Sequence, residues 1–130
     1  MILSDGTIRR MIDTDEIKLI LPEGEKIDDI SSHIVCASFD LRLGNEIKFF
    51  PKHEGVILNP FTTDSKTITE IKRYEDGEDV VVQPGQFLLG ATKERFGIPA
   101  HIVARVEGRS SIARLGLLIH ITAGFIDPGF

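Results

Sequence analysis

The sequence predicts an all-β domain, built as a sandwich or a barrel, with two short helices. Three observations lead to this prediction: the apolar runs are short, turns rich in glycine and proline separate them at regular spacing, and apolar and polar residues alternate within several runs. A chain of 130 residues is expected to form a single domain over residues 1–130 and to bury a substantial core. The sequence contains neither an internal repeat nor an interdomain linker.

The first predicted helix lies near the N-terminus. Ser4 and Asp5 are residue types that cap helices, and apolar residues follow them at helical spacing. These apolar residues are Ile8, Met11 and Ile12. We predict that the helix ends at residues 13–15. Its two arginines, Arg9 and Arg10, are predicted to be solvated charges.

Strands are predicted wherever an apolar run is short or alternates with polar residues. The predicted strands cover residues 17–21, 39–43, 46–50, 56–58, 80–82, 87–92, 102–106 and 117–122. In the second of these strands, Asp40 and Arg42 share the polar face and are expected to pair there or across a subunit boundary.

The segments between these strands are predicted to be turns and loops. Residues 83–86 are predicted to form a turn, because proline is preset for its second position. Residues 96–99 are predicted to form another turn. The polar residues 25–32 are predicted to form a loop, and residues 59–79 a long loop or an irregular hairpin.

The charge and composition exclude several classes of protein. The net charge of −5 argues against binding a nucleic-acid polymer through a basic surface, so a site for a polyanion would be a local basic pocket. The N-terminus lacks the layout of a signal peptide, and no apolar run is long enough to span a bilayer. A cytoplasmic protein without membrane contact is therefore expected. Cys36, the single cysteine, is expected to be a buried small hydrophobe.

A second short helix is predicted at residues 111–115. Gly108 permits a tight bend before it, and Ser110 or Ser111 supplies a hydroxyl that suits a helix N-cap. Gly116 stands where a C′ residue would end the helix. The sequence therefore predicts a helix of about one turn that is capped at both ends.

This short helix carries residue types that suit an anion. Its unpaired N–H groups would lie close to two serine hydroxyls and to the guanidinium groups of Arg109 and Arg114, a combination that favours a phosphate chain. Arg105 completes the local arginine cluster. The alternative is a capped helical turn whose arginines pair with surface carboxylates, and the spacing alone leaves both interpretations open.

Several segments resemble motifs of the dCTP deaminase family, which is related to the trimeric dUTPases. The specific ones are Arg109-Ser110-Ser111, Arg114-Leu115-Gly116 and Ala123-Gly124-Phe125-Ile126-Asp127-Pro128-Gly129-Phe130. Weaker matches, in the family's order, are residues 1–5, 40–44 and 83–87. One departure is Val35-Cys36-Ala37, which stands where the family commonly has a Gln-Pro pair. The resemblance implies a distorted β-barrel or jelly roll of the dUTPase-like type.

The resemblance also implies an activity, the hydrolytic deamination of dCTP to dUTP and ammonia. The alternatives are a dUTP diphosphatase, a bifunctional enzyme that carries out both steps, and a non-catalytic domain for nucleotide binding or assembly. Gly124-Phe125 fits several branches of the superfamily and does not decide between them. The expected partners are dCTP, dUTP and dTTP.

Zinc chemistry is not expected. Many nucleobase deaminases hold zinc with histidine and cysteine, and this chain has one cysteine and four scattered histidines. These are His33, His53, His101 and His120. The resemblance implies that no protein side chain binds a metal and that a glutamate acts as general base. Mg²⁺ would be carried by the oxygens of the triphosphate.

The resemblance assigns roles to individual residues. Ser110 and Arg114 would be catalytic, with Ser110 and the Ala123 carbonyl holding the attacking water and Arg114 steadying the base or the glutamate. Ser111 would cap the helix and bind phosphate, and Asp127 would bind the deoxyribose. The full set of expected substrate-binding residues is Arg109, Ser110, Ser111, Ile112, Ala113, Arg114, Ala123 and Asp127.

Three of these residues or their neighbours have simpler interpretations. Arg114 could be a helix-end salt-bridge donor, and Asp127 before Pro128 could start a turn. His120 interrupts an apolar run and is expected to be a satisfied core histidine rather than a catalyst.

A homotrimer is expected, because sites in the family combine residues of neighbouring subunits. The apolar residues 117–121 could face such a subunit boundary. The family's general-base glutamate and its phosphate-covering C-terminal residues lie beyond Phe130. The chain is therefore expected to be a truncated form that holds part of a site.

Overall fold

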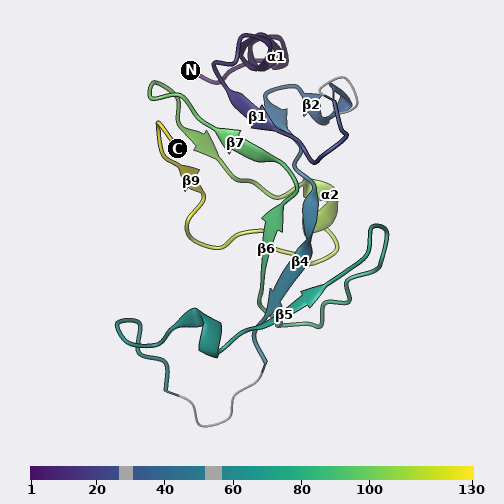
Figure 1. Ribbon diagram of the computed structural model, residues 1–130, viewed down its shortest axis with the longest axis vertical. Coiled ribbons are helices and arrows are strands. Elements are labelled where there is room, and N and C mark those ends of the chain that lie inside the picture. Colours follow the sequence, from purple (N-terminus) through teal and green to yellow (C-terminus); the bar gives the residue numbers. More distant parts are fainter. Residues whose placement is uncertain (27–30, 52–56) are drawn as a thin grey trace. The chain divides into compact units, whose positions relative to one another are not determined.

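Short antiparallel sheets and short helices make up the described part of the chain, and the predicted all-β class is confirmed (Figure 1). The computed structural model describes residues 1–26, 31–51 and 57–130. Within these residues the strands form four small sheets rather than a closed barrel. Both predicted helices are present, and no helix among the described residues has the length and apolar character needed to cross a membrane.

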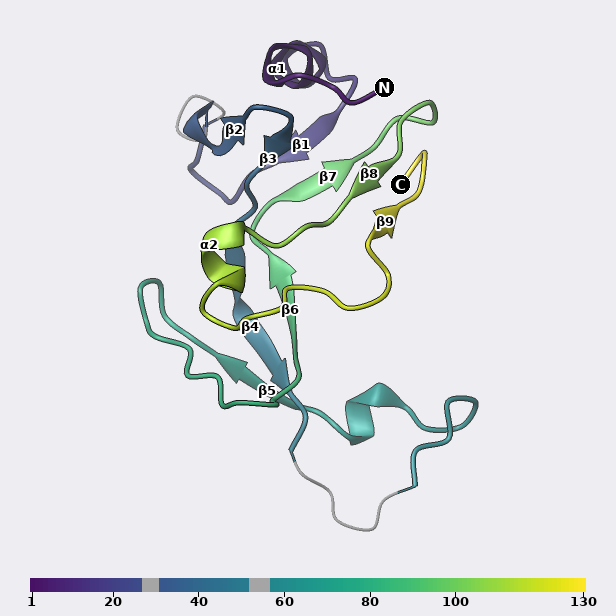
Figure 2. The ribbon, with the colours of Figure 1, turned by 180° about the vertical axis from the view of Figure 1, so that it is seen from behind.

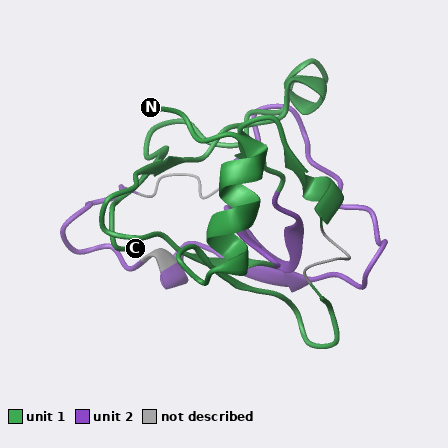
Figure 3. Ribbon diagram, turned by 90° about the horizontal axis from the view of Figure 1, so that it is seen from above, with its two compact units in different colours: residues 1–40, 94–130 green, residues 41–93 purple. Residues whose placement is uncertain are grey.

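The elements follow one another along the chain as a series of short pieces. They are α1 (Asp5–Asp13), β1 (Lys18–Ile20), β2 (Ile34–Val35), β3 (Ser38–Phe39), β4 (Leu43–Phe49), η2 (Ser65–Thr67), β5 (Glu70–Arg73), β6 (Leu88–Thr92), β7 (Arg95–Gly97), β8 (Ala104–Arg105), α2 (Ser110–Ala113) and β9 (Phe125–Ile126). The chain divides into two compact units, Met1–Asp40 with Glu94–Phe130 and Leu41–Lys93 (Figure 3). The single domain expected from the length stays a prediction.

The first unit has its core beneath α1. The helix begins as predicted, because the Ser4 hydroxyl accepts a hydrogen bond from the Thr7 backbone N–H at 3.3 Å. Its apolar face joins the sheet of β1 and β7 and the hairpin of β2 and β3 in one cluster. The buried members are Met11, Ile12, Ile17 and Ile34, and Leu3, Ile8, Leu19, Phe39, Phe96 and Ile102 pack against them. Burying such side chains contributes about 1.5–3 kcal/mol each.

Arg9 holds α1 to the segment that enters β2. Its Nη2 atom donates hydrogen bonds to the Ser31 and Ile34 carbonyl oxygens, both at 2.8 Å. The prediction that Arg9 is a solvated charge is therefore wrong, because its guanidinium donates to two backbone carbonyl oxygens. Arg10 is exposed, as predicted.

Cys36 lies in the two-residue turn between β2 and β3. Its φ is +57°, in the left-handed region, and its side chain is exposed. The expected burial of Cys36 is wrong, because a tight turn presents its central residues outward. The Cys36 carbonyl accepts a hydrogen bond from the Asp5 backbone N–H at 2.6 Å, so the turn also contacts the start of α1.

The second unit has a three-stranded sheet with β4 in the centre, between β5 and β6. Ile47 and Phe49 of β4 are buried. Gly90 stands opposite Ile47, and a Cβ atom there would lie 2.6 Å from Cδ1 of Leu43, so a side chain at this position would require the Leu43 side chain to shift. β5 falls inside the predicted loop 59–79 and was missed, because its polar residues show no strand pattern until they pair with β4.

Several strand predictions are confirmed and others are wrong. The confirmed ones are 17–21, 46–50, 87–92 and 102–106, which contain β1, most of β4, β6 and β8. The structure shows no strand at residues 40–42, 57–58, 80–82 and 117–122. Two parts of the predictions lie outside the described residues: Val56 of the predicted strand 56–58, and residues 27–30 of the predicted loop 25–32. Val81 is 68% exposed. An apolar run becomes a strand only where a neighbouring edge accepts its backbone hydrogen bonds.

The two predicted turns have different outcomes. The turn at 83–86 is confirmed by a hydrogen bond from the Gln86 N–H to the Gln83 carbonyl at 3.0 Å. The turn at 96–99 is wrong, because β7 extends to Gly97 and pairs with β1. A Cβ atom on Gly97 would lie 3.1 Å from Cβ of Lys18. This glycine therefore serves the close approach of two strands rather than a bend.

Candidate functional site

The predicted site residues all belong to the first unit and lie on two segments that flank the sheet of β8 and β9. Ala104 pairs with Ile126 and Arg105 with Phe125, and the Val106 N–H donates to the Gly124 carbonyl at 2.7 Å. The antiparallel register therefore carries the chain from β8 toward α2 beside the segment that enters β9 (Figure 2). This arrangement brings Ala123 to the same end of the sheet as the turn before α2.

Asp127 lies toward the other end of the same sheet. Asp127 follows Ile126, which pairs with Ala104 at the start of β8. Because α2 follows the end of β8 and the two strands are antiparallel, Asp127 and α2 lie at opposite ends of this sheet. Its carbonyl accepts a hydrogen bond from the Phe130 N–H at 3.1 Å, and Gly129 has a φ of +83°. The predicted turn at Asp127 is thus confirmed. The structure does not bring Asp127 together with α2 within one chain, and its role toward deoxyribose stays a prediction.

The helix cap differs from the prediction. Arg109 is the N-cap residue of α2, with φ −64° and ψ 136°, and no side chain supplies a capping hydrogen bond. Ser110 and Ser111 are the first helical residues, so the predicted cap by a serine hydroxyl is wrong. The helix begins one residue earlier than expected, and the Arg109 carbonyl accepts from the N–H groups of Ile112 and Ala113 at 3.0 Å.

The two serine hydroxyls are consequently not used by the helix. Both residues are exposed, and neither hydroxyl has a hydrogen-bond partner within residues 1–26, 31–51 and 57–130. Ile112 is half-buried, and Ala113 is exposed. The helix ends as predicted, since Gly116 has a φ of +84° and its N–H donates to the Ala113 carbonyl at 2.9 Å.

The three nearby arginines have different surroundings. Nε of Arg105 lies 2.5 Å from Oε1 of Glu107, and the Arg105 guanidinium lies over the Phe125 ring at 5.6 Å from its centre. Nη1 of Arg109 lies 3.4 Å from Oδ2 of Asp40. Arg114 is exposed and has no ion-pair partner among the residues that the structure describes. Pairing with a surface carboxylate, which the sequence left open, therefore occurs for Arg109, and Arg114 shows none within residues 1–26, 31–51 and 57–130.

Asp40 is a neighbour of the site that sequence reasoning missed. The sequence suggested Arg42 or another subunit as its partner, and the structure shows the contact with Arg109. No spacing rule could have found this pair, because nearly seventy positions separate the two residues and only the fold brings them together.

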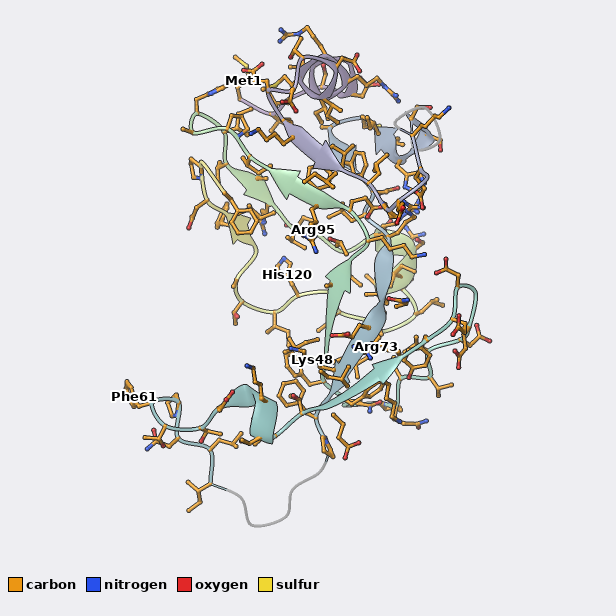
Figure 4. The ribbon with its side chains drawn as sticks, in the orientation of Figure 1. Met1, Lys48, Phe61, Arg73, Arg95 and His120 are labelled. Carbon is orange, nitrogen blue, oxygen red and sulfur yellow. The ribbon has the colours of Figure 1, made fainter. Side chains whose placement is uncertain are left out.

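His120 lies between α2 and β9, in an irregular segment rather than a strand (Figure 4). Both ring nitrogens are buried and have no hydrogen-bond partner in the described part of the chain. The expectation of a satisfied core histidine is therefore wrong. A Cβ atom on Gly124 would lie 2.8 Å from Nε2 of His120, and one on Gly108 would lie 3.0 Å from Cγ1 of Ile119. The absence of a side chain at Gly108 and Gly124 therefore allows Ile119 and His120 to pack close to the backbone at these positions.

Exposed apolar side chains follow one another along this segment. Its members, which we call the apolar surface, are Leu115, Leu117, Leu118, Ile119 and Ile121. Leu115 is 83% exposed and Leu118 is 78% exposed. Apolar side chains gathered in this way are typical of an interface with another protein molecule.

The small antiparallel sheets, with a turn of arginine and serine beside β8 and β9, are consistent with an all-β fold of the dUTPase-like type. Comparison with known proteins supports the same class at the level of sequence. The dCTP deaminase-like family matches residues 2–130, and the chain belongs to this family.

Curated relatives are similar over the whole chain. A protein of Dictyoglomus turgidum named "dCTP deaminase, dUMP-forming" is 41% identical over 130 residues, which cover all of this chain and 64% of the relative. A protein of Natronomonas pharaonis named "dCTP deaminase" is 42% identical, with 100% and 65% covered. One of Methanothermobacter thermautotrophicus named "dCTP deaminase, dUMP-forming" is 42% identical, with 99% and 63% covered. The chain thus spans somewhat less than two thirds of the length of these relatives.

Proposed function

We propose that the full-length protein is a hydrolase that deaminates dCTP. Water adds at C4 of the cytosine, the C4–N bond breaks, and the products are dUTP and ammonia. The observation that carries this proposal is the turn at Arg109–Arg114, where two serine hydroxyls and the Arg114 guanidinium lack partners in the described chain. Polar groups left uncommitted beside one another are suited to hold a ligand. The names of the relatives support the reaction class.

Each polar group has a task in this proposal. The Ser110 hydroxyl and the Ala123 carbonyl hold the attacking water, and the antiparallel register of β8 and β9 keeps their two segments at one end of the sheet. Arg114 steadies the base or the catalytic glutamate through its rigid fork of donors. The proton of the water passes to a glutamate that acts as general base, the role that the resemblance to the family implies.

The remaining residues bind the rest of the nucleotide. Arg109 and Ser111 contact the phosphates, and charge-assisted hydrogen bonds of this kind are among the strongest that a protein makes. The backbone and side chains of Ile112 and Ala113 line the substrate. Mg²⁺ enters with the triphosphate and is bound through phosphate oxygens, the ligands that it prefers. The proposal includes a cytoplasmic location, where free nucleotides are available.

A second candidate function follows from the names of the relatives. Several are called dUMP-forming, which favours a further step in which water cleaves dUTP to dUMP and pyrophosphate.

Incubating the full-length protein with dCTP and separating the nucleotides by chromatography tests both reactions. Ammonia with dUTP alone would support a simple deaminase. Ammonia with dUMP and pyrophosphate would support the bifunctional enzyme. Nucleotide binding without ammonia release would contradict both and favour a non-catalytic domain.

We also propose that the protein is a homotrimer whose sites combine two neighbouring subunits. Asp127 does not meet α2 within one chain, so a neighbouring copy would bring the two segments together. The apolar surface supplies exposed side chains for such an interface. Leu118→Glu should therefore dissociate the full-length assembly and abolish turnover, because a charge at a buried interface lacks a partner. Light scattering measures the mass. A trimer that survives this change, or a wild-type protein that is monomeric, would contradict the proposal.

A further inference from the structure

The backbone of Asp40 is anchored on both sides. The Asp40 N–H donates to the His33 carbonyl at 2.8 Å, and the Asp40 carbonyl accepts from Nδ1 of His33 at 3.0 Å. The preceding residue, Phe39, pairs with Ile34 and packs edge-on against Phe96 at 5.0 Å between ring centres. Residue 40 therefore extends from the hairpin of β2 and β3 at a defined position, and its side chain does not take part in this anchoring.

The Asp40 carboxylate faces the guanidinium of Arg109. Nη1 and Oδ2 are 3.4 Å apart, and the Arg109 side chain is 69% exposed while that of Asp40 is 31% exposed. This is a single contact, whereas a two-pronged pair would join two guanidinium N–H groups to the two carboxylate oxygens. Among the described residues, Arg109 has no other ion-pair partner, and most of its side chain is exposed.

We propose that Asp40 is a specificity-determining residue that competes with phosphate for Arg109. The inference rests on the proposed function, in which Arg109 binds the phosphates of the nucleotide. The carboxylate partly neutralises the guanidinium, and it repels phosphate oxygens that approach to within about a Debye length. A small free anion that binds Arg109 must replace the contact with Asp40, so its net gain in binding free energy is small. A nucleotide, which is held through its base and sugar as well, can displace or share that contact.

The opposite role would be that Asp40 orients Arg109 and so promotes binding. The contact is long and single, and the Arg109 side chain is largely exposed, so the ion pair holds that side chain weakly. Competition and orientation predict opposite signs, because removing the carboxylate strengthens phosphate binding in the first case and weakens it in the second.

The test is to measure the affinity of the full-length protein for inorganic triphosphate by calorimetry, with Asp40→Asn as the variant. The change keeps the size of the side chain and the backbone anchors at His33. Because exposed ion pairs are weak, we expect binding about two- to fivefold tighter. In an Arg109→Ala background the same change should give no gain, since the guanidinium for which Asp40 competes is absent. Asp40→Ser repeats the test if Asp40→Asn fails to fold.

Asp76→Asn is the matched control. Asp76 also pairs with a basic side chain, Lys93, at 2.5 Å, and it belongs to the other unit. The hydrogen bond from Lys93 holds the pKa of Asp76 below its ordinary value, so the control removes a full negative charge. Its triphosphate affinity should equal that of the wild type. A gain as large as that of Asp40→Asn would mean that net charge alone is responsible and would overturn the inference.

Two further outcomes separate this inference from the proposed function. If Arg109→Ala weakens triphosphate binding but Asp40→Asn leaves it unchanged or weakens it, competition is overturned while the phosphate role of Arg109 stands. If Arg109→Ala has no effect on triphosphate affinity, the phosphate role fails and the inference about Asp40 fails with it.

Discussion

Ser110→Ala in the full-length protein is expected to lower turnover by about a hundredfold or more, which is the usual contribution of a group that positions water and assists proton transfer. The hydroxyl is exposed, and it has no hydrogen-bond partner within the described chain. Its removal should therefore leave the melting temperature close to that of the wild type. Steady-state release of ammonia from dCTP, together with thermal melts, measures both quantities.

Ser111→Ala is the matched control for this change. Because Arg109 and not a serine caps α2, Ser111→Ala should not cost the stability that is associated with a lost cap. We expect it to weaken nucleotide binding and to retain most of the turnover at saturating substrate. Near-native turnover in Ser110→Ala with loss of activity in Ser111→Ala would reverse the two roles. No effect in either variant would remove the main support for a deaminase at this turn.

Arg114→Ala and Arg109→Ala are each expected to weaken the binding of a non-hydrolysable dCTP analogue by tenfold or more. A charge-assisted hydrogen bond contributes about 1.5–3 kcal/mol, and about 1.4 kcal/mol corresponds to a factor of ten. The effect should be larger for Arg114, since Arg109 already shares its charge with Asp40. Calorimetry on the full-length variants measures these affinities.

Arg105→Ala provides the comparison. Arg105 pairs with Glu107 and lies over Phe125, so it is already engaged within the sheet of β8 and β9. We expect a change in affinity well below that of the other two arginines. Small and equal effects for Arg109→Ala and Arg114→Ala, in folded proteins, would instead assign both arginines to surface charge pairing.

Local patterns in the sequence predicted the features that depend on neighbouring residues. The helix α1 was predicted from its serine cap and its apolar face, and Gly116 was predicted as the residue that ends α2. The turn at 83–86 follows from Pro84 in the same way. These features depend only on nearby residues, because the hydrogen bonds of caps and turns join groups a few positions apart in the sequence.

Features that depend on a distant partner were predicted poorly. β5 has no apolar pattern, and it is a strand because β4 offers it an edge. The apolar run 117–122 is not a strand, and its side chains remain exposed. For the same reason the sequence predicts a turn at Gly97, although the glycine lies in β7, where a Cβ atom would come within 3.1 Å of Cβ of Lys18.

By itself, the sequence determined the all-β class, the family, the helix α1 and the stretch of arginine and serine where the candidate site lies. Only the tertiary structure decided the surroundings of those residues: Arg109 as the cap, its contact with Asp40, the uncommitted serine hydroxyls, and Asp127 set apart from α2. The physical reason is that residue type sets what a group can donate, accept or bury. Which partner it meets depends on strand register and on chain segments far away in sequence.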